Sequence, residues 1–187
     1  MDWMSIYTSR EGRISRKTWW LASLAMVVVV IILEFIVAAI LGVSMMPNMA
    51  ALSDPNSADA ATVAAQLSDS MRKSAWISLV FFVILFVPIM ALGMKRRHDR
   101  NSNGRDLIIY LALTVILLLI QALGIGAGTT MVGTVAIPSP GPIFTGLSFI
   151  VGIYAIYLLV VMGFLKGTAG PNDYGPDPLG GTAAVAA

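Results

Sequence analysis

The sequence predicts an all-α polytopic membrane protein, a bundle of four transmembrane helices with both termini in the cytoplasm. Of its 187 residues, 57% are hydrophobic and only 12% are charged, whereas about a quarter of the residues in soluble domains carry charge. The apolar residues also form long continuous runs instead of recurring at helical or strand spacing. We therefore expect one membrane domain that covers residues 1–187.

Four apolar runs account for the predicted helices, at about 19–46, 75–94, 107–124 and 143–165. Each is long enough to span a membrane, because a spanning helix needs about 20 apolar residues. The first run is much longer than the apolar region of a signal peptide, so we expect it to be retained. Pro88 lacks a backbone N–H and is expected to kink the second helix in its inner half.

The distribution of basic residues predicts the orientation. Lysine and arginine gather in the cytoplasmic loops of membrane proteins. Ten of the twelve basic residues lie before the first helix, in the loop 95–106 or in the tail 166–187, and only Arg72 and Lys73 lie elsewhere. These segments are therefore predicted to be cytoplasmic.

The loops 47–74 and 125–142 are predicted to lie outside. In the first of them, Ser57 is a candidate N-cap, and Val63, Leu67 and Met71 recur at helical spacing. This short helix either extends the second transmembrane helix or lies on the membrane surface. The second loop is rich in glycine and proline and is expected to be irregular.

Composition also limits the chemistry of the chain. It has no cysteine and one histidine, so thiolate sites, disulfides and multi-histidine metal sites are excluded. The segment around His98 and Asp99 lacks a nucleophile with an oriented base, a phosphate-binding loop and a second set of metal ligands. We expect no catalytic residues, no metal, no cofactor and no nucleic-acid partner.

Two polar residues are predicted to lie within the membrane. Glu34 is fourteen residues beyond Trp20 and Gln121 is fourteen beyond Leu107, so both side chains lie roughly 21 Å along helices that start on the same side. We predict a hydrogen bond between Glu34 and Gln121. It would either hold two helices together or belong to a proton or ion relay.

Three further segments carry recognisable motifs: "GRISRKTWW", "KRRHDRNSNG" and "GTAGPNDYGPDP". In the first, Ser15 is expected to cap the helix by accepting from the Lys17 or Thr18 amide. In their order and placement, the three segments resemble the domain of unknown function 805 family of bacterial inner-membrane proteins. The sequence departs from the family pattern at Asn103, which replaces a serine, and at Arg105 and Asp106, which replace tryptophans. The resemblance implies a location and a fold and names no biochemical activity.

All three motifs fall on the predicted cytoplasmic side, where a compact bundle would gather them. We predict one polar cluster from residues of the three segments: Arg13, Arg16, His98, Asp99, Asn172 and Tyr174. A histidine in such a cluster could make it respond to pH. A distance between His98 and Asn172 beyond about 15 Å, too far for bridging water, would contradict this prediction.

The function expected from these observations is that of a structural, regulatory or interaction component of the bacterial inner membrane. Its partners would be membrane lipids, with anionic headgroups at the polar cluster, and further copies of itself or other membrane proteins. Two alternatives stay open. One is an oligomeric transporter of ions or small solutes that uses Glu34 and Gln121, and the other is a lipid-modifying enzyme that uses His98 and Asp99.

Overall fold

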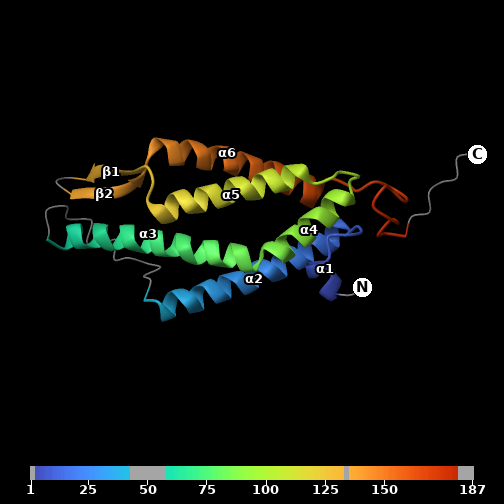
Figure 1. Cartoon of the computed structure of the whole chain (residues 1–187), viewed down its shortest axis with the longest axis horizontal. Helices are drawn as coiled ribbons and strands as arrows, with labels where there is room; N and C mark the ends of the chain where they lie inside the picture. Colours follow the sequence, from blue (N-terminus) through green and yellow to red (C-terminus); the bar gives the residue numbers. More distant parts are fainter. Residues whose placement is uncertain (1–2, 43–57, 133–134, 181–187) are drawn as a thin grey trace, which may run out of the picture. The chain divides into compact units, whose positions relative to one another are not determined.

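The computed structural model describes residues 3–42, 58–132 and 135–180, and about 70% of these described residues are helical (Figure 1). The elements follow one another in this order: α1 (Trp3–Thr8), α2 (Arg16–Ile40), α3 (Ala58–Ile84), α4 (Phe86–His98), α5 (Arg105–Leu123), β1 (Ala127–Val132), β2 (Val135–Pro140), α6 (Pro142–Leu159) and the π-helical segment η2 (Val160–Phe164).

Within the described part of the chain, three helices are long and apolar enough to cross a membrane: α2, α5 and the continuous helix Pro142–Phe164. The pair α3 and α4 makes a fourth candidate if the two are counted as one broken span. Apolar side chains such as Leu24, Ile31 and Phe149 are half or more exposed, which suits a surface that faces lipid. These observations confirm a mostly helical chain of membrane character.

The predicted second helix, 75–94, begins earlier and ends later in the structure, and it is broken into α3 and α4. Helix α3 already begins at Ala58, so the short helix expected around Val63 is continuous with it. The candidate cap Ser57 lies outside the described residues, as do residues 43–46 of the first predicted helix. Helix α3 ends at Ile84, and α4 begins at Phe86. The reason is Pro88, whose ring clashes with the carbonyl four residues earlier and whose nitrogen cannot donate to it.

The fold is mostly helical as predicted, but it also contains a small sheet, because the loop 125–142 that was expected to be irregular forms a hairpin. Strands β1 and β2 pair antiparallel, with Ala127 opposite Pro140 and Val132 opposite Val135. Threonine, valine and isoleucine supply the β-branched side chains that favour a strand. The glycine and proline content that suggested irregular structure lies largely at the ends of the hairpin.

The sequence analysis also missed α1, a short helix before the first motif. Its residue Ile6 is buried. The Tyr7 hydroxyl donates to the Ala22 carbonyl of α2 at 3.0 Å, and the Lys95 ammonium of α4 donates to the Ser5 carbonyl. The N-terminal segment is therefore tied to two helices.

The chain divides into two compact units. We call the described residues of 1–30, 82–112 and 152–187 the motif unit, and those of 31–81 and 113–151 the hairpin unit. The motif unit has an apolar core built from residues of α1, α2, α4, α5 and the last helix, among them Ile6, Trp19, Leu92, Leu107 and Leu158. It also contains all three sequence motifs.

Candidate functional site

Asp99 lies at the centre of a buried group of charges in the motif unit, directly after α4. Its Oδ1 accepts from the Arg13 Nε at 3.2 Å and from the Arg13 Nη2 at 3.1 Å. Its Oδ2 accepts from the Arg96 guanidinium. The side chains of Arg13, Arg96 and Asp99 are only 1%, 0% and 5% exposed. Charges this deeply buried need close partners, and one carboxylate serves both arginines.

The remaining donors of Arg96 go to the end of the last helix. Its Nε donates to the Met162 carbonyl at 2.6 Å and its Nη2 to the Leu165 carbonyl at 2.5 Å. Two neighbouring carbonyls accept from side chains of α2. The Trp20 indole donates to the Gly163 carbonyl at 3.1 Å, and the Arg16 guanidinium donates to the Phe164 carbonyl at 2.8 Å. The last carbonyls of a helix have no partner within it. Basic and indole side chains from two other helices supply those partners here.

The tail that follows is held in the same way. Arg13 donates to the Thr168 and Gly170 carbonyls, both at 2.7 Å. The Thr168 amide donates to the Asp99 backbone carbonyl at 2.8 Å. The backbone of Gly167 packs directly against the Asp99 carboxylate, since a Cβ at this position would overlap it. The glycine of the third motif is therefore required by the aspartate of the second.

His98 contacts the tail through its ring and through its backbone. The ring stacks on Tyr174 with a centroid distance of 3.9 Å and an interplanar angle of 5°. The Asn172 side-chain amide donates to the His98 carbonyl at 2.9 Å, and the Asn172 Oδ1 accepts from the Tyr174 amide at 2.9 Å. In the part of the chain that the structure describes, the His98 Nδ1 is buried without a hydrogen-bond partner.

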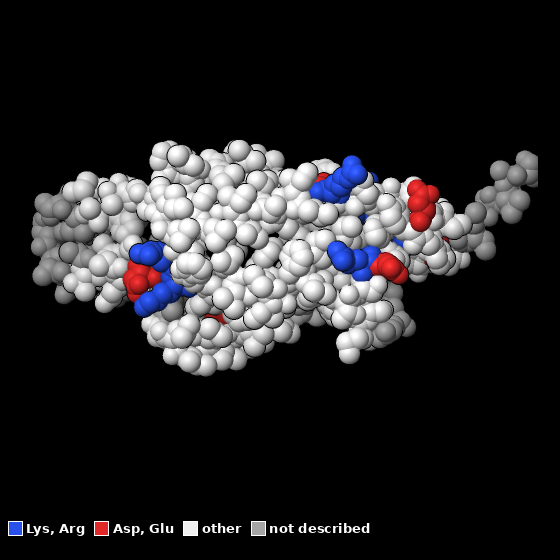
Figure 2. Space-filling model, in the orientation of Figure 1, with Lys and Arg blue, Asp and Glu red and all other residues white. Residues whose placement is uncertain are grey.

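A polar pocket of about 310 Å³ opens beside these contacts. Arg16, Arg96 and Lys166 line it together with Asp99 and Asp177. The side chains of Arg16 and Lys166 are exposed, unlike that of Arg96. Figure 2 shows charged side chains of both signs, Lys and Arg together with Asp and Glu, gathered toward the end of the motif unit that carries the tail.

Asp177 is the second acid of this pocket, and it is bound by backbone amides. The Leu179 amide donates to Oδ1 at 2.9 Å and the Gly170 amide to Oδ2 at 3.0 Å. These two hydrogen bonds, with the nearby charge of Arg13, hold the pKa of Asp177 below its ordinary value. Asp177 is thus an ionised turn-forming residue at neutral pH.

The six residues predicted to cluster lie in one region of the motif unit. The contacts between Arg13 and Asp99, between Asn172 and His98 and between His98 and Tyr174 join five of them directly. Arg16 shares the polar pocket with Asp99. Ser15 also caps α2 as expected, accepting from the Thr18 amide at 3.3 Å. Whether this cluster binds a ligand stays a prediction.

Lys95, Arg96 and Arg97 were predicted as cytoplasmic basic residues largely accounted for by topology, and the structure adds a packing role for them. All three are buried. Arg97 forms an ion pair with Asp106 at 2.6 Å, and Tyr154 donates to the Asp106 carbonyl at 2.8 Å. Successive residues point in directions about 100° apart around a helix. Three consecutive charges therefore cannot all face a membrane surface, and that spacing was the available signal.

Comparison with known proteins bears directly on these segments. The family model described as "Protein of unknown function (DUF805)" matches residues 7–176. The chain belongs to the DUF805 family. The match covers the first two motifs, the third motif as far as Pro176, and all six residues predicted to cluster. No curated protein and no solved structure matches this DUF805 chain.

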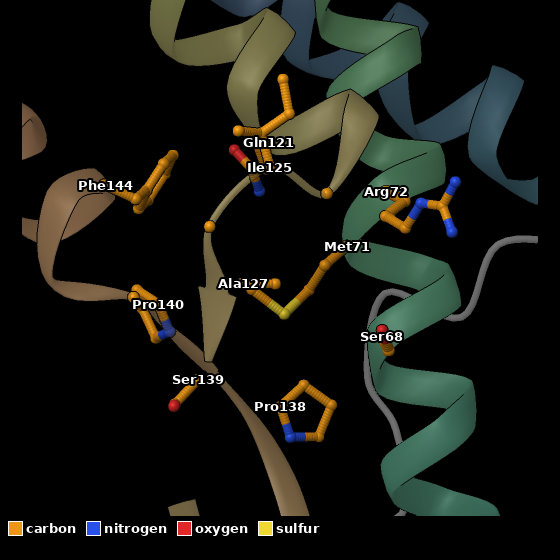
Figure 3. A pocket seen from close by; sticks show the side chains of 13 residues that line it. Ser68, Met71, Arg72, Gln121, Ile125, Ala127, Pro138, Ser139, Pro140 and Phe144 are labelled. Carbon is orange, nitrogen blue, oxygen red and sulfur yellow. The ribbon is translucent and has the colours of Figure 1, made fainter. Parts of the chain in front are cut away.

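Glu34 and Gln121, the two polar residues of this DUF805 protein that were predicted to lie within the membrane, have separate surroundings within the hairpin unit. The Glu34 carboxylate accepts from the Ser78 hydroxyl at 3.4 Å. Gln121 instead lines a small pocket of about 80 Å³ with Met71, Pro138 and Phe144 (Figure 3). Among the described residues, the hydrogen-bond partner of Glu34 is therefore Ser78 and not the predicted Gln121. The sequence offered no way to choose between these two partners.

The described residues contain no group of three or more His, Cys, Asp or Glu side chains placed to hold a metal ion. His98 and Asp99 are adjacent, but their side chains are used differently. The His98 ring stacks on an aromatic residue, and the Asp99 carboxylate receives two guanidinium groups.

Proposed function

We propose that this DUF805 protein is a non-enzymatic interaction component of the bacterial inner membrane whose charged end contacts anionic lipid headgroups. The observation that carries the proposal is the polar pocket edged by the exposed side chains of Arg16 and Lys166. A guanidinium has five N–H donors, and Arg16 gives one of them to the Phe164 carbonyl. Donors are therefore left for a phosphate.

The surroundings of the pocket also favour a headgroup. Trp20, four residues after Arg16, is partly exposed and donates its indole N–H to the end of the last helix. Tryptophan prefers the headgroup region of a membrane, and basic residues there attract anionic lipid. The basic residues around the pocket belong to the segments that the sequence pattern assigns to the cytoplasmic side. We therefore place the pocket at the inner leaflet.

The pocket also holds two carboxylates, and they limit the attraction. Asp99 is neutralised by Arg13 and Arg96. Asp177 is ionised and faces the same space as Arg16 and Lys166. A phosphate would therefore bind on the side of the two exposed basic residues, away from Asp177.

The experiment compares lipids retained by the full-length protein after purification in mild detergent. The protein is incubated with equal amounts of phosphatidylglycerol and phosphatidylcholine, and native mass spectrometry counts the bound lipids of each kind. We expect phosphatidylglycerol to be retained preferentially. The double variant Arg16→Gln/Lys166→Gln should lose this preference, because both exposed positive charges are removed.

Lys17→Gln is the matched control. It removes an exposed positive charge next to Arg16, but Lys17 does not line the pocket. Equal preference for phosphatidylglycerol in the double variant, the control and the unchanged protein would refute the proposed function.

A further inference from the structure

A second cavity lies in the motif unit, and it is apolar. Its volume is about 230 Å³. Side chains of α2, α4, α5 and α6 line it, among them Trp19, Leu92, Leu107 and Ala155. Helices α2, α5 and α6 lie in candidate membrane spans, and α4 belongs to the bent pair of helices that makes a fourth candidate. The cavity therefore lies in the part of the unit that hydrocarbon would surround.

Helix α2 connects the polar pocket to the apolar cavity along one face. Arg16 lines the pocket, and Trp19, Ser23 and Met26 line the cavity. These residues follow one another at spacings of three, four and three, so they form a single stripe along the helix. The stripe changes from charged to apolar within one turn.

Helix α4, and the last helix together with the segment that follows it, repeat this arrangement. On α4, Arg96 lines the pocket, while Leu92 lies four residues earlier and lines the cavity. Met162 of the last helix also lines the cavity, and Lys166, which lies two residues beyond the end of that helix, lines the pocket. Arg96 also links α4 to the last helix, because its Nε donates to the Met162 carbonyl at 2.6 Å. Two helices and the segment that follows the last helix thus place basic groups at one end of the apolar cavity.

The stretch of α2 that lines the pocket and the cavity is about as long as the hydrocarbon of one membrane leaflet is thick. From Arg16 to Met26 is ten residues, or roughly 15 Å at the helical rise of 1.5 Å per residue. The hydrocarbon core of a bilayer is about 30 Å thick, so a single leaflet accounts for about half of it. A molecule with an anionic group at one end and an acyl chain as long as a leaflet would fit both cavities at once.

We propose that a single anionic phospholipid is held in the motif unit, with its phosphate between Arg16 and Lys166 and one acyl chain in the apolar cavity beside Ser23 and Ala155. This inference rests on the proposed function and deepens it, because it makes the lipid a resident ligand held at both ends. Attraction at the surface alone would need only the basic residues. A resident lipid also needs space for its chain.

The test fills the cavity without changing any charge. Ser23→Leu and Ala155→Leu each place a larger apolar side chain in the cavity. Ala25→Leu is the matched control, since Ala25 is exposed on the same helix and does not line the cavity. The full-length proteins are loaded with phosphatidylglycerol in mild detergent. Native mass spectrometry then measures how much lipid stays bound as the activation energy rises.

We expect both cavity variants to lose most of the bound phosphatidylglycerol at energies at which Ala25→Leu and the unchanged protein retain it. A second arm uses glycerol 3-phosphate, which has the anionic group but no chain. Its binding should be weak in every protein and unchanged by the two cavity variants. Thermal unfolding of each variant identifies any that fails to fold, and the two independent cavity positions guard against that outcome.

Three results would overturn the inference. If both folded cavity variants retain phosphatidylglycerol as well as the control, no chain occupies the cavity. The proposed function survives this result as long as Arg16→Gln/Lys166→Gln still abolishes the preference for anionic lipid. If glycerol 3-phosphate binds as tightly as the lipid, the pocket is a site for a soluble phosphate. A dimer that carries no lipid would identify a second copy of the chain as the occupant.

Discussion

Asp99→Asn is the sharpest test of how the charged end is held together. The substitution keeps the shape of the side chain and removes the only negative charge that contacts Arg13 and Arg96 in the described structure. The asparagine amide would also bring N–H donors toward one of the two guanidinium groups. Two buried cations would then be left without a counter-ion.

The size of the effect follows from burial. Removing one partner of a buried ion pair costs about 3–5 kcal/mol of folding free energy. Backbone carbonyls also accept from Arg13 and Arg96, so both cations keep part of their solvation. We therefore expect a loss of about 3 kcal/mol, at the lower end of that range.

Asp69→Asn serves as the control. Asp69 pairs with Lys73 at 2.6 Å, but these side chains are 61% and 52% exposed. Exposed pairs contribute about 0–1 kcal/mol, so the distance alone would give a misleading ranking. Unfolding in mixed detergent micelles, followed by tryptophan fluorescence, gives both free energies. A loss in Asp99→Asn that lies within about 1 kcal/mol of the control would refute the argument that Asp99 is the essential counter-ion.

Two further predictions concern the tail. Gly167→Ala places a Cβ where the Asp99 carboxylate lies, so we expect it to lower the free energy of unfolding by about 1–3 kcal/mol through overpacking. The control is Gly152→Ala, whose added Cβ meets no neighbour. It should cost nothing in the same unfolding assay. The pKa of Asp177 is lowered in the folded state, first of all by the hydrogen bond from the Leu179 amide. The stabilisation that ionised Asp177 provides is therefore present above its unfolded pKa of 3.8, and it is lost as the pH falls through the lower folded pKa. Protease protection of the tail should therefore fall in this acidic window, and Asp177→Asn should flatten that part of the profile.

Much of the fold could be predicted because the membrane imposes simple requirements. Long apolar runs give α5 and the last helix with ends close to the predicted ones, whereas α2 ends at Ile40, six residues before its predicted end. The tail is rich in residues that favour tight turns, and in the structure Asn172 and Gly175 pair there through their backbones. These features depend on local sequence, and for that reason composition and spacing were sufficient.

The missed features depend on contacts between distant residues. The sequence shows that Pro88 disturbs a helix, but not that α3 would end at Ile84. Nor does it show that Arg96 is fully buried, because its acceptors are carbonyls almost seventy residues away. Every residue type has a backbone carbonyl, so this kind of acceptor leaves no signature in the sequence. The three motifs could be placed together, but their bonds could not be assigned.

Four basic residues of the motif unit form two pairs with different expected roles. Arg13 and Arg96 are buried and spend their donors on Asp99 and on carbonyls of the last helix and tail. Arg16 and Lys166 are exposed at the pocket. A positive charge that only sets orientation could occupy any of these positions, so topology alone predicts that the two pairs are interchangeable. The geometry predicts instead that loss of a buried arginine lowers stability, whereas loss of an exposed basic residue lowers lipid retention.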